Sequence, residues 1–125
     1  MLRTIFKSKI QKATVTQTKM DYEGSIGIDA TLMEMADILA NEKVQVLNLD
    51  TGARFETYTI KEKAGSGAIC LYGPAAHKGA AGEKVFIISY CLVDEKEAQN
   101  VKPKIVYVDE HNQVRPKLMK VEKNG

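Results

Sequence analysis

The sequence predicts a mainly β protein that folds as one small β-barrel domain. Runs rich in β-branched and aromatic residues recur along the chain, and glycine-rich corners separate them. A single segment shows the apolar spacing that is typical of a helix. The 125 residues suffice for one hydrophobic core, so the prediction is a single domain over residues 1–125. Many short strands with tight corners and little helix indicate a barrel.

The first half of the chain contains the predicted helix. β-Branched residues at close spacing predict extended strand over residues 3–18, and Ile26 and Ile28 begin another short strand. Asp29 is the expected N-cap of a helix that covers residues 31–39 and ends at 41–42. The apolar positions that follow helical spacing there are Leu32, Met35, Ala36 and Leu39.

Strands and turns account for the rest of the chain. Further strands are predicted over residues 43–49, 53–60, 68–71, 85–92 and 104–108. Gly52 is expected to take a positive φ in a hairpin turn at 50–52. Residues 73–79 form a loop or one helical turn, and 94–98 a short surface helix. The run 85–92 is apolar throughout, which is typical of a strand buried on both faces. About residues 110–125 are expected to form a flexible tail.

Composition excludes several classes of function. Eighteen basic and sixteen acidic residues leave a net charge of +2, too balanced for a nucleic-acid-binding face. Cys70 and Cys91 lie in apolar runs as expected of buried thiols, and no cysteine or histidine cluster suggests a metal site. His77 and His111 predict no catalytic triad. Charges near the N-terminus argue against a signal peptide, and no apolar segment is long enough to cross a membrane, so a soluble, cytoplasmic protein is expected.

The segment from Tyr22 to Asp29, YEGSIGID, interrupts a region that otherwise alternates like β-strand. One interpretation is a type II or I′ turn, with Ser25 starting the next strand. The other is a site where the backbone is cut between Gly24 and Ser25. These eight residues alone favour the turn.

Segments elsewhere in the chain form a larger sequence pattern together with YEGSIGID. They are Arg3-Thr4, Lys9, Tyr22 to Ser25, Ile28-Asp29, Asn41 to Val44, Gly52 to Tyr58, Gly65 to Gly67, Gly73 with Ala75-Ala76, and Gly82 to Val85. In this order and spacing, over about residues 1–110, they resemble the pyruvoyl-dependent aspartate decarboxylase family. The resemblance implies a six-stranded double-psi β-barrel with small helices, assembled as a homotetramer with active sites between neighbouring subunits. It implies a lyase that converts L-aspartate to β-alanine and CO₂ for pantothenate and coenzyme A biosynthesis.

The resemblance also implies that the chain is a zymogen that makes its own cofactor. Decarboxylation leaves a carbanion, which needs an electron sink that ordinary side chains do not offer. In the family, the serine hydroxyl attacks the preceding carbonyl, and elimination and hydrolysis then leave a covalent pyruvoyl group. Autocatalytic cleavage at Gly24–Ser25 would give a short chain of residues 1–24 and a long chain of residues 25–125. The glycine suits the reaction because it tolerates unusual dihedral angles.

The family pattern assigns roles to matching residues of this chain. Ser25 is implied as the pyruvoyl precursor and the position where the substrate forms its Schiff base, and Tyr58 as the proton donor. Implied substrate contacts are Lys9, Arg54, Thr57, Gly73, Pro74 and Ala75. Arg54 suits this role because a guanidinium matches a carboxylate in a bidentate fork. Thr57 is also implied in holding the scissile carbonyl during cleavage. Without the resemblance, the Lys9, Arg54 and Tyr58 side chains would be read as ordinary strand residues.

Tyr22 and Tyr72 are expected to support the cleavage site. Tyr72 stands where the family usually has asparagine, and Pro74 removes a backbone N–H donor from the following loop. Both departures keep open a second hypothesis, a non-processing β-barrel that serves as an interaction subunit. A small barrel that binds a peptide, nucleic acid or ligand without catalysis is the third.

Overall fold

The computed structural model describes residues 1–115 and confirms a mainly β protein. The eight strands are β1 (Leu2–Thr14), β2 (Gln17–Lys19), β3 (Ser25–Asp29), β4 (Lys43–Asn48), β5 (Arg54–Glu62), β6 (Ile69–Tyr72), β7 (Lys84–Asp94) and β8 (Lys104–Tyr107). They form one sheet in the order β2-β6-β3-β5-β4-β7-β1-β8. Short helices accompany them: α1 (Ala30–Met35), the 3₁₀ helix η1 (Gly73–Lys78) and α2 (Glu95–Ala98).

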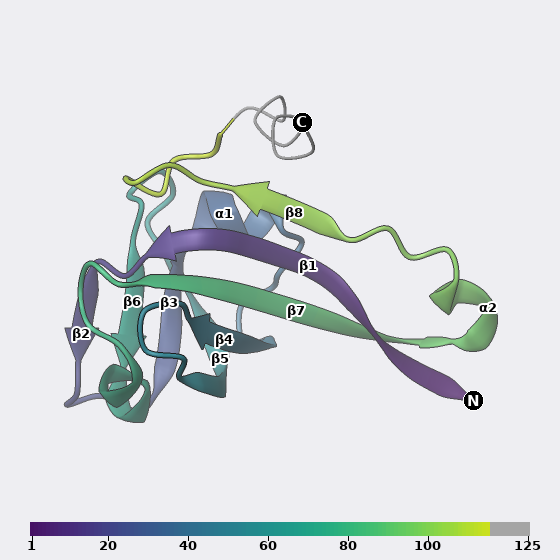
Figure 1. Cartoon of the computed structure of the whole chain (residues 1–125), viewed down its shortest axis with the longest axis horizontal. Helices are drawn as coiled ribbons and strands as arrows, with labels where there is room; N and C mark the ends of the chain where they lie inside the picture. The colour runs from purple at the N-terminus through teal and green to yellow at the C-terminus, as the bar shows by residue number, and fades with distance from the viewer. Residues whose placement is uncertain (116–125) are drawn as a thin grey trace.

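The two longest strands form an extended arm. β1 and β7 pair antiparallel from Leu2 opposite Asp94 to Thr14 opposite Lys84. They run side by side past the ends of β4 and β5 and carry α2 and the N-terminus at the far end (Figure 1). Large apolar side chains stay exposed on this arm, and Leu92 is 63% exposed.

Strand β3 lies in the middle of a group of strands that are distant in sequence. It pairs parallel with β5, Ile26 opposite Thr59, and antiparallel with β6, Ser25 opposite Tyr72. The helix η1 begins directly after β6. This topology therefore brings the Gly24–Ser25 bond next to β5 and to the start of η1, although these segments follow it by many residues.

The core is made by one face of the strands, and the prediction for residues 85–92 is wrong in this respect. Along β7, Val85 and Ile87 are buried, whereas Phe86 and Ile88 are half-buried and Tyr90 is exposed. The strand therefore alternates in the ordinary way of a sheet that packs one face on a core. Its continuous apolar run leaves a second apolar face that one chain does not cover.

The predicted helix is present but shorter than expected. Asp29 is its N-cap and accepts a hydrogen bond from the Thr31 N–H at 2.8 Å, as predicted. The helix stops at Met35 because Asp37 takes a left-handed conformation with φ of 56°. The Ile38 N–H then reaches back to the Met33 carbonyl and the Asp37 N–H to the Glu34 carbonyl, which is a Schellman ending.

Asp29 and Asn112 tie three loops together. The carboxylate of Asp29 accepts hydrogen bonds from the backbone N–H groups of Gly65 and Gly67 as well as Thr31. Burial acts to raise the pKa of Asp29, but these N–H groups outweigh it, and the pKa lies below its ordinary value. Asn112 donates to the Gly67 and Thr14 carbonyls and accepts from the Thr14 N–H.

Residues 110–115 of the predicted tail thus contact the strands through Asn112, while 116–125 lie outside the described residues. Within residues 1–115, no helix is long and apolar enough to span a membrane.

Candidate active site

Ser25, the first residue of β3, is fully buried with 0% exposure. Within residues 1–115, its hydroxyl is the one buried side-chain oxygen or nitrogen that has no hydrogen-bond partner. Gly24 before it has φ of 104°, a conformation that residues with a Cβ rarely adopt. The scissile bond of the sequence hypothesis thus joins a glycine in an unusual conformation to an unpaired buried hydroxyl.

The start of η1 closes over this bond. A Cβ on Gly73 would lie 2.5 Å from the Gly24 nitrogen and 2.6 Å from the Tyr22 carbonyl oxygen, so only a glycine fits there. Gly73 itself has φ of 62°. Pro74 lies on the other side of Gly24, with its Cδ 3.1 Å from where a Cβ of Gly24 would be. Pro74 occupies the first turn of η1, where a missing N–H costs the helix nothing.

A cleft of about 390 Å³ opens beside Gly24. Its lining residues are Glu23, Gly24, Phe55, Glu56, Thr57, Tyr58, Pro74, Ala75 and Lys78. Five of the residues predicted for the site are therefore brought together in one chain: Gly24, Thr57, Tyr58, Pro74 and Ala75. Lys9 and Arg54 do not line this cleft.

Strand register places Tyr58 and Ser25 on the same face of the sheet. Ile26 pairs with Thr59, so the preceding residues of these parallel strands, Ser25 and Tyr58, point to the opposite side from that pair. Tyr58 is 37% exposed and therefore accessible from the cleft. Thr57 points to the other face of β5 and is half-buried, yet it also lines the cleft.

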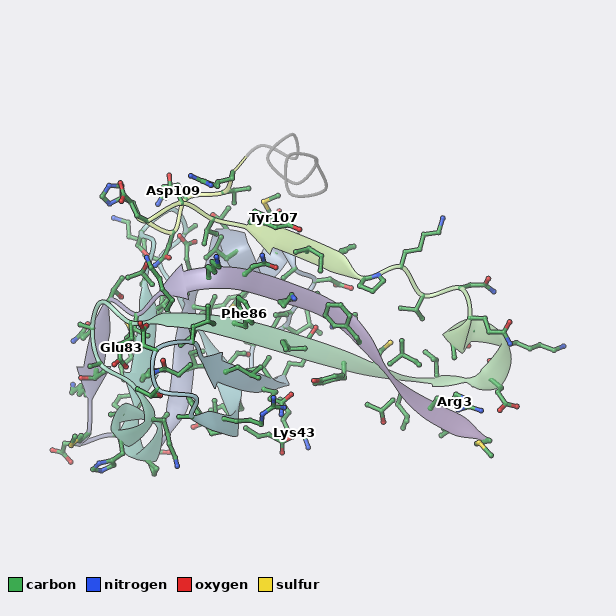
Figure 2. The ribbon with its side chains drawn as sticks, viewed as in Figure 1. Arg3, Lys43, Glu83, Phe86, Tyr107 and Asp109 are labelled. Atoms are coloured by element: carbon green, nitrogen blue, oxygen red, sulfur yellow. The ribbon has the colours of Figure 1, made fainter. Side chains whose placement is uncertain are left out.

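Lys9 and Arg54 lie on the face of the sheet that carries Tyr58. Arg54 pairs with Leu47 on β4, and Leu47 pairs with Phe86 on β7. The Lys9 ammonium lies 5.0 Å from the centre of the Phe86 ring, a cation–π contact. Phe86, labelled in Figure 2, is thus next to Lys9 and two strands from Arg54. Neither basic residue lines the cleft, although Arg54 directly precedes Phe55 and Glu56, which do.

Tyr72 makes contacts that the sequence did not predict. Its hydroxyl donates a hydrogen bond of 2.7 Å to Glu62, and its ring packs against Tyr22 with centroids 4.6 Å apart. Burial, and then the hydrogen bond to Glu62, raises the pKa of the Tyr72 phenol above its usual value. The phenol is therefore a neutral donor that is directed to Glu62.

Sequence reasoning missed four residues at the cleft, Glu23, Phe55, Glu56 and Lys78, and also Glu62, which accepts the Tyr72 hydrogen bond. Glu23 precedes Gly24, and Phe55 and Glu56 precede Thr57, so proximity in sequence was an available signal. Lys78 ends η1 and Glu62 ends β5, and nothing in their local pattern distinguishes them from surface residues.

The histidines lie apart from each other and from this arrangement. His77 is exposed on η1, and His111 contacts Glu110 at 3.8 Å on the surface. Within the described chain, no group of three or more histidine, cysteine, aspartate or glutamate residues could hold a metal ion.

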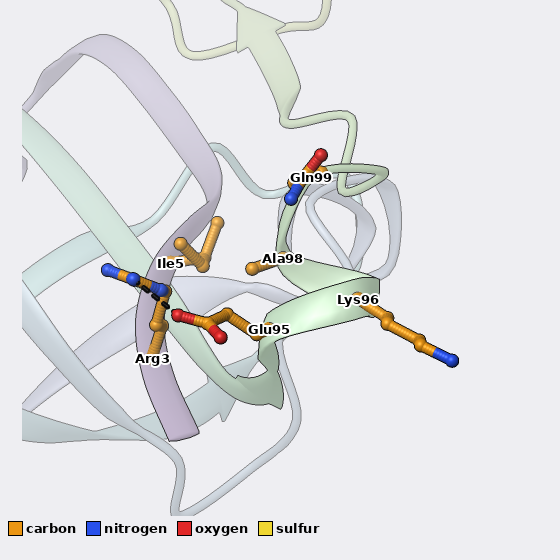
Figure 3. Close-up of a pocket in the computed structure, with 6 residues that line it drawn as sticks. All are labelled: Arg3, Ile5, Glu95, Lys96, Ala98 and Gln99. Atoms are coloured by element: carbon orange, nitrogen blue, oxygen red, sulfur yellow. Dashed lines mark hydrogen bonds and ion pairs between the residues drawn. The ribbon is translucent and has the colours of Figure 1, made fainter. Parts of the chain in front are cut away.

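A second hollow of about 470 Å³ lies at the end of the β1–β7 arm (Figure 3). Its lining residues are Arg3, Ile5, Glu95, Lys96, Ala98 and Gln99, and Arg3 forms an ion pair of 2.6 Å with Glu95. None of the predicted site residues lines it, so the candidate site remains the cleft at Gly24.

Comparison with known proteins finds relatives over nearly the whole chain. The family described as aspartate decarboxylase matches residues 1–115. A protein of Thermoanaerobacter pseudethanolicus named aspartate 1-decarboxylase is 54% identical over 112 residues, 90% of this chain and 96% of the relative. A relative of the same name from Caldicellulosiruptor saccharolyticus is 54% identical over 91% of this chain and 89% of the relative. Another from Myxococcus xanthus is 50% identical over 93% of this chain and 89% of the relative. The chain therefore belongs to the aspartate decarboxylase family.

Proposed function

We propose that this protein converts L-aspartate to β-alanine and CO₂, supplies pantothenate biosynthesis with β-alanine, and uses a pyruvoyl group made from Ser25. The family match supports the reaction. The single structural observation that carries the proposal is the buried, unpaired Ser25 hydroxyl next to a glycine with φ of 104°. A type II or I′ turn would account for the positive φ of Gly24 but not for a buried hydroxyl that has no partner.

The residues around the bond fit the formation of a pyruvoyl group. The Ser25 Oγ attacks the Gly24 carbonyl carbon, the C–N bond breaks, and the proton passes to the Ser25 nitrogen, which gives an ester. Loss of the Ser25 α-proton then expels Gly24 as a carboxylate and leaves a dehydroalanine. One water hydrolyses its imine tautomer to the ketone and releases ammonia. Because the Oγ has no hydrogen-bond partner to give up, the attack breaks no such contact.

The other residues of the chain bind and orient the substrate and move one proton. When present, the pyruvoyl carbonyl supplies the electron sink for the pair of electrons left by departing CO₂. Tyr58 Oη donates a proton to the carbon that has lost CO₂. Thr57 and the segment Gly73 to Ala75 hold the substrate in the cleft, Thr57 also holds the Gly24 carbonyl during cleavage, and Arg54 and Lys9 bind carboxylate.

The protein works as a homotetramer with active sites between subunits in this proposal. Lys9 and Arg54 do not line the cleft, which supports delivery of these cations by a neighbouring subunit. We further propose one domain over residues 1–125 with a six-stranded double-psi barrel at its centre. The parallel pairs β1–β8, β2–β6 and β3–β5 join strands distant in sequence and support such crossing connections. In this proposal the tetramer is a cytoplasmic enzyme.

The direct test measures β-alanine and CO₂ produced from L-aspartate by the purified protein and by two variants. Ser25→Ala should abolish the activity while the chain stays whole and folded, since no partner of the hydroxyl is left unpaired. Tyr58→Phe is the matched control. It should cleave normally and lose about 10²- to 10⁴-fold in kcat, the usual contribution of a general acid. Production of β-alanine by a homogeneous Ser25→Ala protein would refute the proposal.

A further inference from the structure

Lys78 supplies the positive charge of the cleft at Gly24. The other charged residues that line the cleft are Glu23 and Glu56, so Lys78 is its one cation among residues 1–115. Glu56 already has a partner in Lys43, 3.8 Å away. The Lys78 ammonium forms no ion pair within the described chain. An unpaired cation therefore lines the cleft that is proposed to hold the carboxylate substrate.

A hydrogen bond from a buried side chain fixes the backbone of Lys78. Asn48, 3% exposed, donates one hydrogen bond to the Lys78 carbonyl at 3.0 Å and another to Glu83 at 2.9 Å. Glu83, labelled in Figure 2, also accepts from the Ala80 N–H at 2.8 Å. These bonds hold the end of η1 while Gly73 holds its start against Gly24. The Lys78 side chain therefore begins from a defined position at the cleft.

The chemistry of the reaction decides which carboxylate a cation should bind. The α-carboxylate of aspartate loses its charge as CO₂ departs, so a cation on it would stabilise the ground state more than the transition state. The side-chain carboxylate keeps its charge throughout and remains in β-alanine. A cation on this group strengthens binding of substrate, transition state and product alike, which changes KM and leaves kcat nearly constant.

We propose that Lys78 is a specificity-determining residue that binds the retained side-chain carboxylate of the substrate from within the same chain as Ser25. This inference rests on the proposed decarboxylation. Arg54 and Lys9 then come from a neighbouring subunit, whereas Lys78 does not depend on assembly for its position.

The Lys78→Met variant tests the inference by steady-state kinetics with L-aspartate. Rates are expressed per cleaved chain, and the amount of cleaved chain is measured by intact mass. KM should rise about tenfold, the lower end of the effect of a lost charge-assisted hydrogen bond, because Lys78 is exposed. The kcat should stay within about twofold. The inhibition constant of β-alanine should rise by the same factor as KM, since β-alanine carries only the retained carboxylate.

Two further variants serve as controls. Lys63→Met removes the same charge from an exposed position that does not line the cleft and should leave KM unchanged. Lys78→Arg keeps the charge and should restore most of the affinity.

Several results would overturn the role of Lys78: an unchanged KM in Lys78→Met, an equal rise in Lys63→Met, or a raised KM with unchanged β-alanine inhibition. Absence of cleavage in both Lys78 variants would also overturn it, because Lys78 would then act in maturation. If the parent protein itself fails to turn over aspartate, the proposed function fails instead.

Discussion

The hydroxyl of Ser25 costs the uncleaved chain stability. A buried polar group without a hydrogen-bond partner costs about 1–3 kcal/mol. The φ of Gly24 adds no such cost, because glycine adopts positive φ readily. The proposed cleavage would convert the serine and remove the unpaired hydroxyl. The unfavourable group therefore lies at the bond that is proposed to break.

Tyr72 should slow self-cleavage, because its hydroxyl is directed to Glu62 instead of the scissile bond. Tyr72→Asn should therefore cleave faster than the parent, since an amide offers both a donor and an acceptor. Tyr72→Phe, which loses only the Glu62 hydrogen bond, is the matched control and should cleave no faster. The measurement is the fraction of cleaved chain over time by intact mass. Equal or slower cleavage in Tyr72→Asn would mean that the chain has adapted to the tyrosine.

At the scale of elements, η1 acts as a cover for the cleavage site. Gly73→Ala should block cleavage, because the new Cβ would overlap Gly24 and displace the scissile bond. Gly52→Ala is the control: Gly52 also has a positive φ, of 79°, but open space where a Cβ would lie. It should lose about 1 kcal/mol of stability and cleave at the parental rate. Parental cleavage in Gly73→Ala would show that η1 does not position the bond.

The hydrogen bonds between Asp29 and the loops around it should make the stability of the protein depend on pH. The pKa of Asp29 is lower in the folded protein than its ordinary value of 3.8. The contribution of Asp29 to stability is therefore complete above pH 3.8 and is lost as the pH falls through the folded pKa. Asp29→Asn should destabilise the protein by about 1–3 kcal/mol at pH 7, because one backbone N–H loses its acceptor. Urea unfolding measures the free energy of unfolding at pH 7 and at about pH 3. The difference between these two values should be smaller for Asp29→Asn than for the parent. An equal difference would remove Asp29 from this role.

Local pattern predicted most elements, and the failures have physical causes. The N-cap at Asp29 and the turn at Gly52 follow from single residues and were correct. The helix end was missed because an aspartate, Asp37, takes the left-handed conformation that ends the helix, so no glycine marks this position in the sequence. Family resemblance indicated Gly24, Thr57 and Tyr58, which the cleft brings together. Lys78 and Glu62 could not be found because only the fold brings them to the site.

For the whole molecule, the main structural argument for assembly is that neither Lys9 nor Arg54 lines the cleft. The exposed apolar residues along β7 agree with a face that another subunit covers. A site shared between subunits has a consequence that a site within one chain does not have. Two different inactive chains can restore each other when they assemble.

Complementation tests this arrangement. Ser25→Ala chains, which cannot cleave, and Arg54→Ala chains, which bind substrate poorly, should be coexpressed with different tags and purified through both. Mixed assemblies should exceed pure Arg54→Ala protein in kcat/KM per cleaved chain by several-fold, because Ser25→Ala subunits would supply the missing guanidinium. No gain in the mixed assemblies would place Arg54 in the site of its own chain.

Intact mass spectrometry of the purified, active protein measures whether the Gly24–Ser25 bond is cut. We expect two chains, residues 1–24 with a free carboxylate and residues 25–125 with a pyruvoyl group in place of Ser25. Ser25→Ala should give one chain of 125 residues. A single uncleaved chain in a preparation that decarboxylates aspartate at full rate would refute cleavage as the source of the cofactor.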